Sequence, residues 1–144
     1  MPAVGASASP FQRDARIVMV VVAHLNVRSV ASDGRLSEIG SLLSFHNIDI
    51  LCLSETWLKP HHMSSALLIS GYQPLLRRDR PVERGGGVAI YLRDGFACKR
   101  LYVVPDDIEC LALEICLPHR KSLRLLAIDP QVATWTFSLT PWML

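Results

Sequence analysis

Two polar side chains, Asn26 and Glu55, stand at the ends of two apolar segments of this sequence. Asn26 ends "RIVMVVVAHLN" (16–26), and Glu55 follows "IDILCLS" (48–54). If both segments are parallel strands, their carboxyl ends meet at one edge of a sheet, where functional groups gather. A carboxylate there can bind Mg²⁺ through oxygen, and a neighbouring amide can orient a ligand. From spacing alone, two ordinary solvated residues at strand ends are the more common explanation.

The residues between these two segments predict a helix over 35–46. The apolar positions fall on one helical face: Leu36, Ile39, Leu42 and Leu43. Ser32 or Asp33 can cap its start, and Asn47 can adopt the left-handed conformation at its end. Strand, helix and strand with short connections predict a right-handed crossover between parallel strands.

Both strands of this unit carry apolar residues on each face. This pattern is typical of central strands covered by a layer on either side. A second helix is expected around 61–69. The chain then changes character, because short strands follow one another closely, with turn residues between them: 85–94, 98–104, 108–117 and 122–128. Close spacing favours antiparallel hairpins, so the prediction is a mixed α/β sheet protein.

Composition excludes a disordered chain and says little about partners. Half of the 144 residues are hydrophobic, which is enough for one domain with a real core. A net charge of +2 is too small to indicate nucleic-acid binding by itself. Four arginines lie close together, and a solvated loop is a more frequent explanation for such a cluster than phosphate contact: Arg77, Arg78, Arg80 and Arg84.

The cysteines and the longest apolar run indicate where the protein resides. The four cysteines show neither zinc-ligand spacing nor the density of a disulfide scaffold, so a reducing, intracellular compartment is expected. The run 17–25 has about half the length needed to cross a bilayer. Asp14 precedes it and no small-residue cleavage site follows, so neither a signal peptide nor a membrane anchor is predicted.

Four segments, taken in order, resemble a known superfamily. They are "LNVRS" (25–29), "DILCLSETWL" (49–58), "RGGGVAIYLRD" (84–94) and "LRLLAI" (123–128). Together they are similar to the endonuclease/exonuclease/phosphatase superfamily, most of all to the apurinic-type endonuclease domains of non-LTR retrotransposons. This resemblance implies a four-layer α/β sandwich with a divalent-metal site between two sheets. It also implies DNA as the partner of the parent domain and, for the retrotransposon branch, a nuclear location.

The resemblance assigns roles to the two residues singled out above. It implies that Glu55 is a catalytic metal ligand for Mg²⁺ or Mn²⁺, and that Asn26 is a catalytic residue beside the metal and the scissile phosphate. Arg28 stands where many relatives outside the retrotransposon branch carry an acidic residue.

The resemblance ends near residue 128. Asp129 and Pro130 replace a tyrosine-containing "YRPP"-like segment, and the chain has no "GDFN"-like motif and no Asp-His pair near its end. The expected organisation is therefore a flexible leader (1–15), the amino-terminal half of the family domain (16–128) and a non-family tail (129–144). The expected architecture is a partial two-sheet, four-layer α/β sandwich with exposed edges that favour aggregation.

The implied function is that of a fragment of a Mg-dependent phosphodiesterase, a retrotransposon DNA endonuclease, which is inactive on its own and binds its cation weakly. A complementary half is a candidate partner. Two alternatives remain open: a non-catalytic remnant that binds metal or nucleic acid weakly, and a phosphatase-type relative of the same superfamily.

Other polar and aromatic residues receive structural interpretations. His61 and His62 are expected in a solvated turn, since adjacent side chains rarely bind one ion. His24 is expected to be a hydrogen-bonded core histidine. The glycines 85–87 predict a flexible lead into a strand with close sheet packing, and Trp57 is expected to pack over its loop rather than stack on a base.

Overall fold

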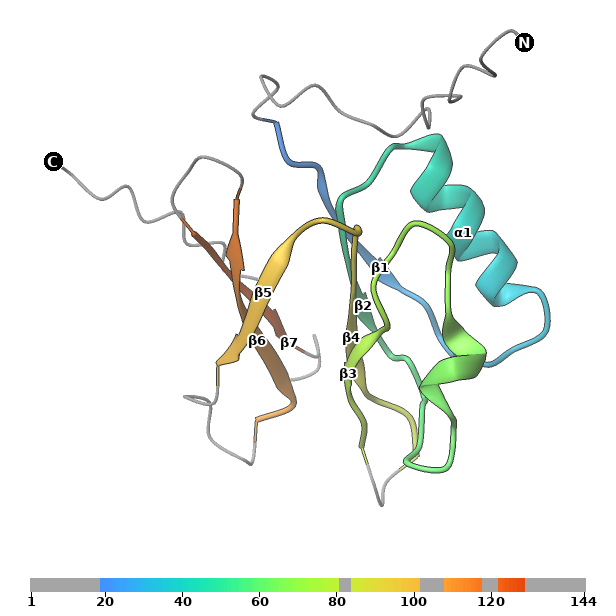
Figure 1. Cartoon of the computed structure of the whole chain (residues 1–144). Coiled ribbons are helices and arrows are strands. Elements are labelled where there is room, and N and C mark those ends of the chain that lie inside the picture. The colour runs from blue at the N-terminus through green and yellow to red at the C-terminus, as the bar shows by residue number, and fades with distance from the viewer. Residues whose placement is uncertain (1–18, 81–83, 102–107, 118–121, 129–144) are drawn as a thin grey trace, which may run out of the picture.

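Two β-sheets face each other, and one α-helix covers the outer side of the larger sheet (Figure 1). The computed structural model describes residues 19–80, 84–101, 108–117 and 122–128. The predicted leader (1–15) and tail (129–144) lie outside these residues. A mixed α/β fold with two sheets is thus confirmed, and it agrees with a partial sandwich. Among the described residues, no helix covers the outer side of the smaller sheet.

The larger sheet contains the predicted strand–helix–strand unit. Strand β1 (Val22–Asn26) is followed by α1 (Arg35–Phe45) and by β2 (Ile50–Ser54), which pairs with β1 in parallel. Strands β4 (Val88–Leu92) and β3 (Leu76–Arg78) complete the order β1-β2-β4-β3 with antiparallel pairing. The parallel crossover is confirmed. The prediction that the first strand is central is not confirmed, because β1 lies at the edge of the described sheet.

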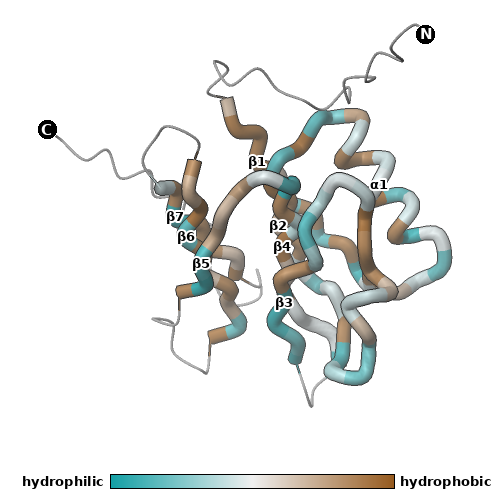
Figure 2. Tube along the Cα trace, viewed as in Figure 1, coloured by the Kyte–Doolittle hydropathy of each residue, from teal (hydrophilic) through white to brown (hydrophobic). Residues whose placement is uncertain are grey.

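The smaller sheet is an antiparallel meander, as the close strand spacing predicts. It consists of β5 (Ala97–Leu101), β6 (Cys110–Cys116) and β7 (Leu123–Ile128), with β6 in the centre. Hydrophobic residues concentrate along the strands of both sheets (Figure 2). One hydrophobic core, made of residues from both sheets, lies between them.

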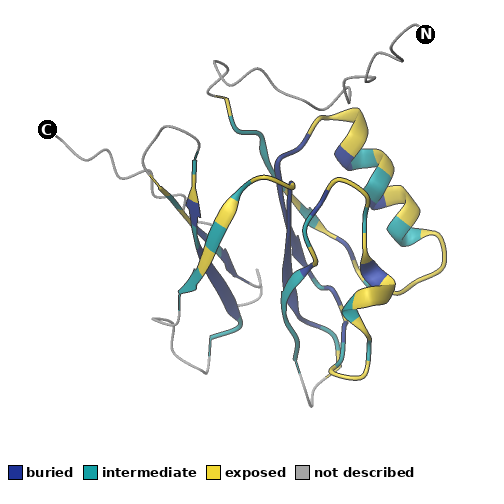
Figure 3. Cartoon of the chain, viewed as in Figure 1, coloured by how far each residue is buried: buried dark blue, intermediate teal, exposed yellow. Residues whose placement is uncertain are grey.

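Strand β2 is buried on both faces and separates two hydrophobic cores (Figure 3). Leu51 and Leu53 belong to the core beneath α1. Ile50 and Cys52 belong to the core between the sheets. All four are at most 2% exposed, and burial raises the pKa of the Cys52 thiol to about 12. The residues that follow β2 therefore extend from a strand that is packed on both faces.

The ends of α1 differ in how well the sequence predicts them. Asn47 has φ 50°, which confirms the left-handed residue after the helix. The helix starts differently, because Gly34 with φ 75° is the N-cap and makes no side-chain capping bond. The prediction that Ser32 or Asp33 caps the helix is therefore wrong. Instead, the Ser32 carbonyl accepts a hydrogen bond from the Arg35 N–H at 3.1 Å.

The segment 61–69 is not an α-helix, contrary to the prediction. It contains only the short 3₁₀-helix η1 (Ser64–Leu67), in which Leu67 alone is buried. The Tyr91 hydroxyl donates to the Leu67 carbonyl at 2.7 Å, so a tertiary contact uses a carbonyl that a longer helix would need. One short turn also gains too few backbone bonds to offset helix nucleation.

His24 is hydrogen-bonded but does not belong to the core. Its Nε2 lies 3.0 Å from Ser54 Oγ, yet the residue is exposed because β1 lies at the sheet edge. The predicted core position is wrong, whereas the predicted hydrogen bond is present. Of the helices that the described residues form, none has the length and apolar character needed to span a membrane.

Candidate metal site at the end of strand β2

Asn26 and Glu55 lie at the same edge of the larger sheet. The β1–β2 register pairs Asn26 with Ser54, the residue before Glu55. The two segments stay paired beyond the strands, because the Ser29 N–H donates to the Glu55 carbonyl at 2.9 Å and the Val30 N–H to the Thr56 carbonyl at 3.0 Å. Asn26 is exposed and Glu55 is half-buried. The structure therefore brings both residues to the edge where the sequence places them, while their chemical roles stay predictions.

The backbone leaves β2 in an unusual conformation. Glu55 and Trp57 both have φ 54°, a region that residues other than glycine seldom occupy. The N–H groups of Thr56 and Trp57 donate to the carbonyls of Gly87 and Gly86 at 3.2 and 2.9 Å. Backbone strain of this kind persists where surrounding contacts enforce it, and it concentrates at functional sites.

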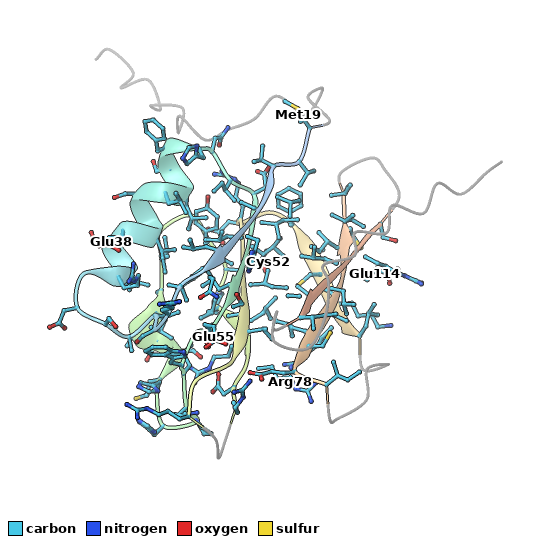
Figure 4. The ribbon with its side chains drawn as sticks, turned by 180° about the vertical axis from the view of Figure 1, so that it is seen from behind. Met19, Glu38, Cys52, Glu55, Arg78 and Glu114 are labelled. Atoms are coloured by element: carbon cyan, nitrogen blue, oxygen red, sulfur yellow. The ribbon has the colours of Figure 1, made fainter. Side chains whose placement is uncertain are left out.

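Two N–H groups orient the Glu55 carboxylate. Its Oε2 accepts hydrogen bonds from Trp57 Nε1 at 2.7 Å and from the Gly86 N–H at 3.1 Å. In Figure 4, Cys52 lies between the sheets, and Glu55 lies just beyond the end of β2, toward the end of the sandwich where Arg78 also lies. Trp57 is 43% exposed. A β-carbon on Gly85 would lie 3.6 Å from Trp57 Nε1, so the indole packs over the glycine loop as expected.

The glycine loop 85–87 fits closely against the segment that carries Glu55. All three glycines have positive φ angles, of 78°, 71° and 94°. A β-carbon on Gly86 would lie 2.3 Å from Arg80 Cζ, and one on Gly87 would lie 2.3 Å from Thr56 Oγ1. The predicted close packing is thus confirmed. The loop needs glycine for its conformation and for space, not only as a flexible lead into β4.

A second carboxylate, which sequence analysis missed, also binds this loop. Glu109, one residue before β6, accepts a hydrogen bond from the Gly87 N–H. Arg80 Nε and Nη2 donate to Glu109 Oε2 at 3.0 and 2.6 Å. The only signal for this residue in the sequence was a carboxylate among the apolar residues of 108–117, together with the arginine cluster.

Two residues of the arginine cluster, Arg77 and Arg80, connect separate segments of the fold. Arg77 binds the Asp79 carboxylate at 2.6 Å and the carbonyls of Lys59 and His62 at 2.8 and 2.7 Å. The Arg77 and Arg80 side chains are only 12% and 18% exposed. A solvated loop is therefore the wrong description of these two residues, because they join segments that are distant in the sequence.

The His61–His62 pair forms part of a turn, as expected. His62 Nδ1 accepts a hydrogen bond from the Lys59 N–H at 2.9 Å, and His61 is exposed.

The donor set of the site fits a divalent cation only in part. Across residues 19–80, 84–101, 108–117 and 122–128, no group of three or more His, Cys, Asp or Glu side chains is arranged to hold a metal ion. Glu55 offers one oriented carboxylate, and a hard cation such as Mg²⁺ normally takes several oxygen ligands, including waters and substrate phosphates. The described residues therefore fit one protein ligand of such a site.

Comparison with known proteins agrees with this fold. Residues 23–128 match a sequence model of the Endonuclease/Exonuclease/phosphatase family. No curated protein sequence matches the chain.

Three similar solved structures come from different organisms and differ in the names they carry. An AP endonuclease from Leishmania major superposes with a TM-score of 0.54 at 18% identity, covering 74% of this chain and 38% of that one. A 3′ phosphatase from Neisseria, bound to a product DNA hairpin, has a TM-score of 0.51 at 23% identity and covers 76% and 41%. A mannosyl-6-phosphatase from Bacteroides thetaiotaomicron has a TM-score of 0.51 at 19% identity and covers 75% and 50%. The chain thus spans half or less of each of these relatives, and the likeness concerns the fold.

Proposed function

Because this chain belongs to the endonuclease/exonuclease/phosphatase family, we propose that its site binds a phosphate ester, with Glu55 as a ligand of Mg²⁺ or Mn²⁺ and Asn26 beside the phosphate. One observation carries this proposal: β1 and β2 end side by side, and Trp57 and Gly86 orient the Glu55 carboxylate there. In phosphate-ester hydrolysis a divalent cation neutralises developing negative charge on the phosphate oxygens. Asn26, which is exposed at this edge, can donate its amide N–H to such an oxygen.

The proposed substrate of the parent domain is DNA. Two of the structures similar to this chain are an AP endonuclease and a 3′ phosphatase bound to a DNA hairpin, which supports this choice. The four ordered motifs, above all "LSETWL" and "RGGGVAIYLRD", further support an origin in a non-LTR retrotransposon endonuclease, and with it a nuclear location. Residues 16–128 then correspond to the amino-terminal half of that domain, consistent with coverage of half or less of each relative.

We propose that the chain, by itself, does not hydrolyse phosphodiesters. The reaction needs a positioned water and a base or its equivalent in addition to a metal. Glu55 and Asn26 supply one metal ligand and one amide, and the sequence contains no "GDFN"-like segment to add a further Asp. The proposal therefore requires a complementary segment that adds these groups, whether it belongs to the same polypeptide or to a partner.

A second candidate function is hydrolysis of a small phosphate monoester. The similar mannosyl-6-phosphatase, which has the same fold and comparable coverage, favours this alternative. Its substrate is a sugar phosphate by name, so the shared fold does not by itself require DNA.

Supercoiled plasmid and a chromogenic phosphate monoester, each with Mg²⁺ or Mn²⁺, test the proposal. We expect no plasmid nicking above the level of the Glu55→Gln variant, together with Mn²⁺ binding that Glu55→Gln abolishes. Nicking that depends on Glu55 would show that the chain is active alone. Monoester hydrolysis that depends on Glu55 would favour the phosphatase, and Mn²⁺ binding that Glu55→Gln leaves unchanged would refute the metal assignment.

A further inference from the structure

The glycine loop beside Glu55 binds one carboxylate from each sheet. The Gly86 N–H donates to Glu55 Oε2 at 3.1 Å, and the next N–H, that of Gly87, donates to Glu109 Oε1. Glu55 follows β2 of the larger sheet, whereas Glu109 precedes β6 of the smaller sheet. Consecutive N–H groups therefore connect the candidate metal ligand to the opposite sheet.

Arg80 fixes Glu109 in this arrangement. Its Nε and Nη2 donate to Glu109 Oε2, so the other oxygen, Oε1, is turned toward the Gly87 N–H. The two side chains are only 18% and 13% exposed, and charge-assisted hydrogen bonds that are shielded from water in this way are strong. The guanidinium also lies directly against the loop, because a β-carbon on Gly86 would be 2.3 Å from Arg80 Cζ.

The loop can pass this constraint to Glu55 because its geometry leaves little freedom. The carbonyls of Gly86 and Gly87 accept hydrogen bonds from Trp57 and Thr56, so both sides of the loop are tied to the segment that follows β2. The Gly86–Gly87 peptide carries both the Gly87 N–H that donates to Glu109 and the Gly86 carbonyl that accepts from Trp57, so a rotation of this peptide would break both bonds and disturb the loop beside Glu55.

We propose that Glu109 and Arg80 position the Glu55 carboxylate through the Gly86–Gly87 loop. This inference rests on the role of Glu55 as a metal ligand proposed above. Removing a side chain that orients a metal ligand typically weakens metal binding about 10- to 100-fold. Glu109 is thus a positioning residue of the site, although it belongs to the other sheet.

The test compares Glu109→Ala and Glu109→Gln with Glu114→Ala. Glu114 is the matched control, because it lies on β6 and pairs with Arg124 at 3.4 Å on the more exposed side of the sheet. Three quantities are measured: the Trp57 indole N–H resonance, the hydrogen-exchange rate of the Gly86 amide and the Mn²⁺ dissociation constant. The Trp57→Phe variant assigns the indole resonance. The indole resonance is a property of the folded state, so lower global stability alone does not move it.

We expect Glu109→Ala to shift the indole resonance, to speed Gly86 exchange and to weaken Mn²⁺ binding about 10-fold. Glu109→Gln keeps an oxygen for Gly87 and should give smaller changes in the same direction, which decides the matter if Glu109→Ala does not fold. Glu114→Ala should match the wild type. Wild-type indole resonance and Gly86 exchange in the Glu109 variants would overturn the inference. If the wild-type chain binds no Mn²⁺, the metal assignment fails, and the two proton measurements still decide the positioning role.

Discussion

The two ends of strand β2 are each flanked by an acidic residue, and the two carboxylates differ in their burial and in their hydrogen-bond partners. Asp49, just before the strand, has a side chain only 1% exposed and binds Arg93 Nε through Oδ1 at 2.9 Å and the Val21 N–H through Oδ2 at 2.8 Å. Arg93 also donates to Asn47 Oδ1 and the Ile48 carbonyl, and its guanidinium lies 5.3 Å from the centre of the Tyr72 ring. Glu55, just after the strand, is half-buried and accepts bonds from the indole of Trp57 and the backbone of Gly86.

This difference separates a carboxylate that supports the fold from the carboxylate that we propose as a metal ligand. A guanidinium neutralises Asp49 inside the protein, and removing either partner leaves an uncompensated buried charge. The N–H groups of Trp57 and Gly86 orient the Glu55 carboxylate, which is compatible with the cation contact proposed for it. The strained backbone at Glu55 and Trp57 adds to this contrast, because strain is retained where function or packing demands it.

Arg93→Met should give the largest effect, because it leaves Asp49 buried without its guanidinium. We expect the free energy of unfolding to fall by about 3–5 kcal/mol, measured by urea denaturation. Arg124→Met is the control: its partner is Glu114 at 3.4 Å, the two side chains are 64% and 27% exposed, and the loss should stay below about 1 kcal/mol. Equal losses of unfolding free energy in the two variants would show that the buried Asp49–Arg93 pair matters no more to stability than the exposed pair.

Gly87→Ala should come next, because it disturbs the loop that orients Glu55. The φ angle of 94° costs an alanine about 1–2 kcal/mol, and its β-carbon would lie 2.3 Å from Thr56 Oγ1 in a fully buried position. Overpacking of this kind adds about 1–3 kcal/mol. Gly95→Ala isolates the conformational cost, since Gly95 has φ 95° and no atom within 4 Å of the added carbon. Similar losses of unfolding free energy in both variants would show that the loop has room to relax.

The sequence predicts β2, and the positions of Asn26 and Glu55 at one edge of the sheet, better than it predicts what surrounds them. The alternation of Leu51 and Leu53 with Ile50 and Cys52 is a local pattern, so burial on both faces follows from a few residues. The parallel unit then places Asn26 beside the end of β2. The partners of the polar groups are not local: Arg80 and Glu109 are 29 positions apart, and Asp49 and Arg93 are 44 apart. No periodicity in the sequence indicates such pairs, which explains why the sequence alone predicts a solvated loop for Arg80.

Glu55→Gln should leave the fold nearly intact but remove its response to metal. The amide keeps the shape of the side chain and an oxygen for the two N–H donors, so we expect unfolding free energy to change by less than about 1 kcal/mol. Mn²⁺ at ten times its dissociation constant should stabilise the wild type by about 1.4 kcal/mol and the variant not at all, measured by urea denaturation with and without the ion. The control is Asp49→Asn, which should lower stability and keep the response to Mn²⁺. If Mn²⁺ still stabilises the Glu55→Gln variant, the ion binds at another position in the protein.

The smallest expected effect concerns His24, which lies near the Glu55 end through its contact with Ser54 Oγ at 3.0 Å. Partial burial lowers the pKa of this imidazole from its ordinary value of 6.5, so folding favours the neutral ring. The neutral ring's contribution to stability is therefore present above about pH 6.5 and is lost as the pH falls through the lower folded-state value. Because the residue is exposed, the wild type should lose only about 0.5 kcal/mol or less of unfolding free energy relative to His24→Gln between pH 7.5 and pH 5. Urea denaturation of both proteins at the two pH values measures this difference. A pH dependence identical in both proteins would mean that solvent screens His24 completely, and the stability near this end of the sheet would then depend on the loop and not on the imidazole.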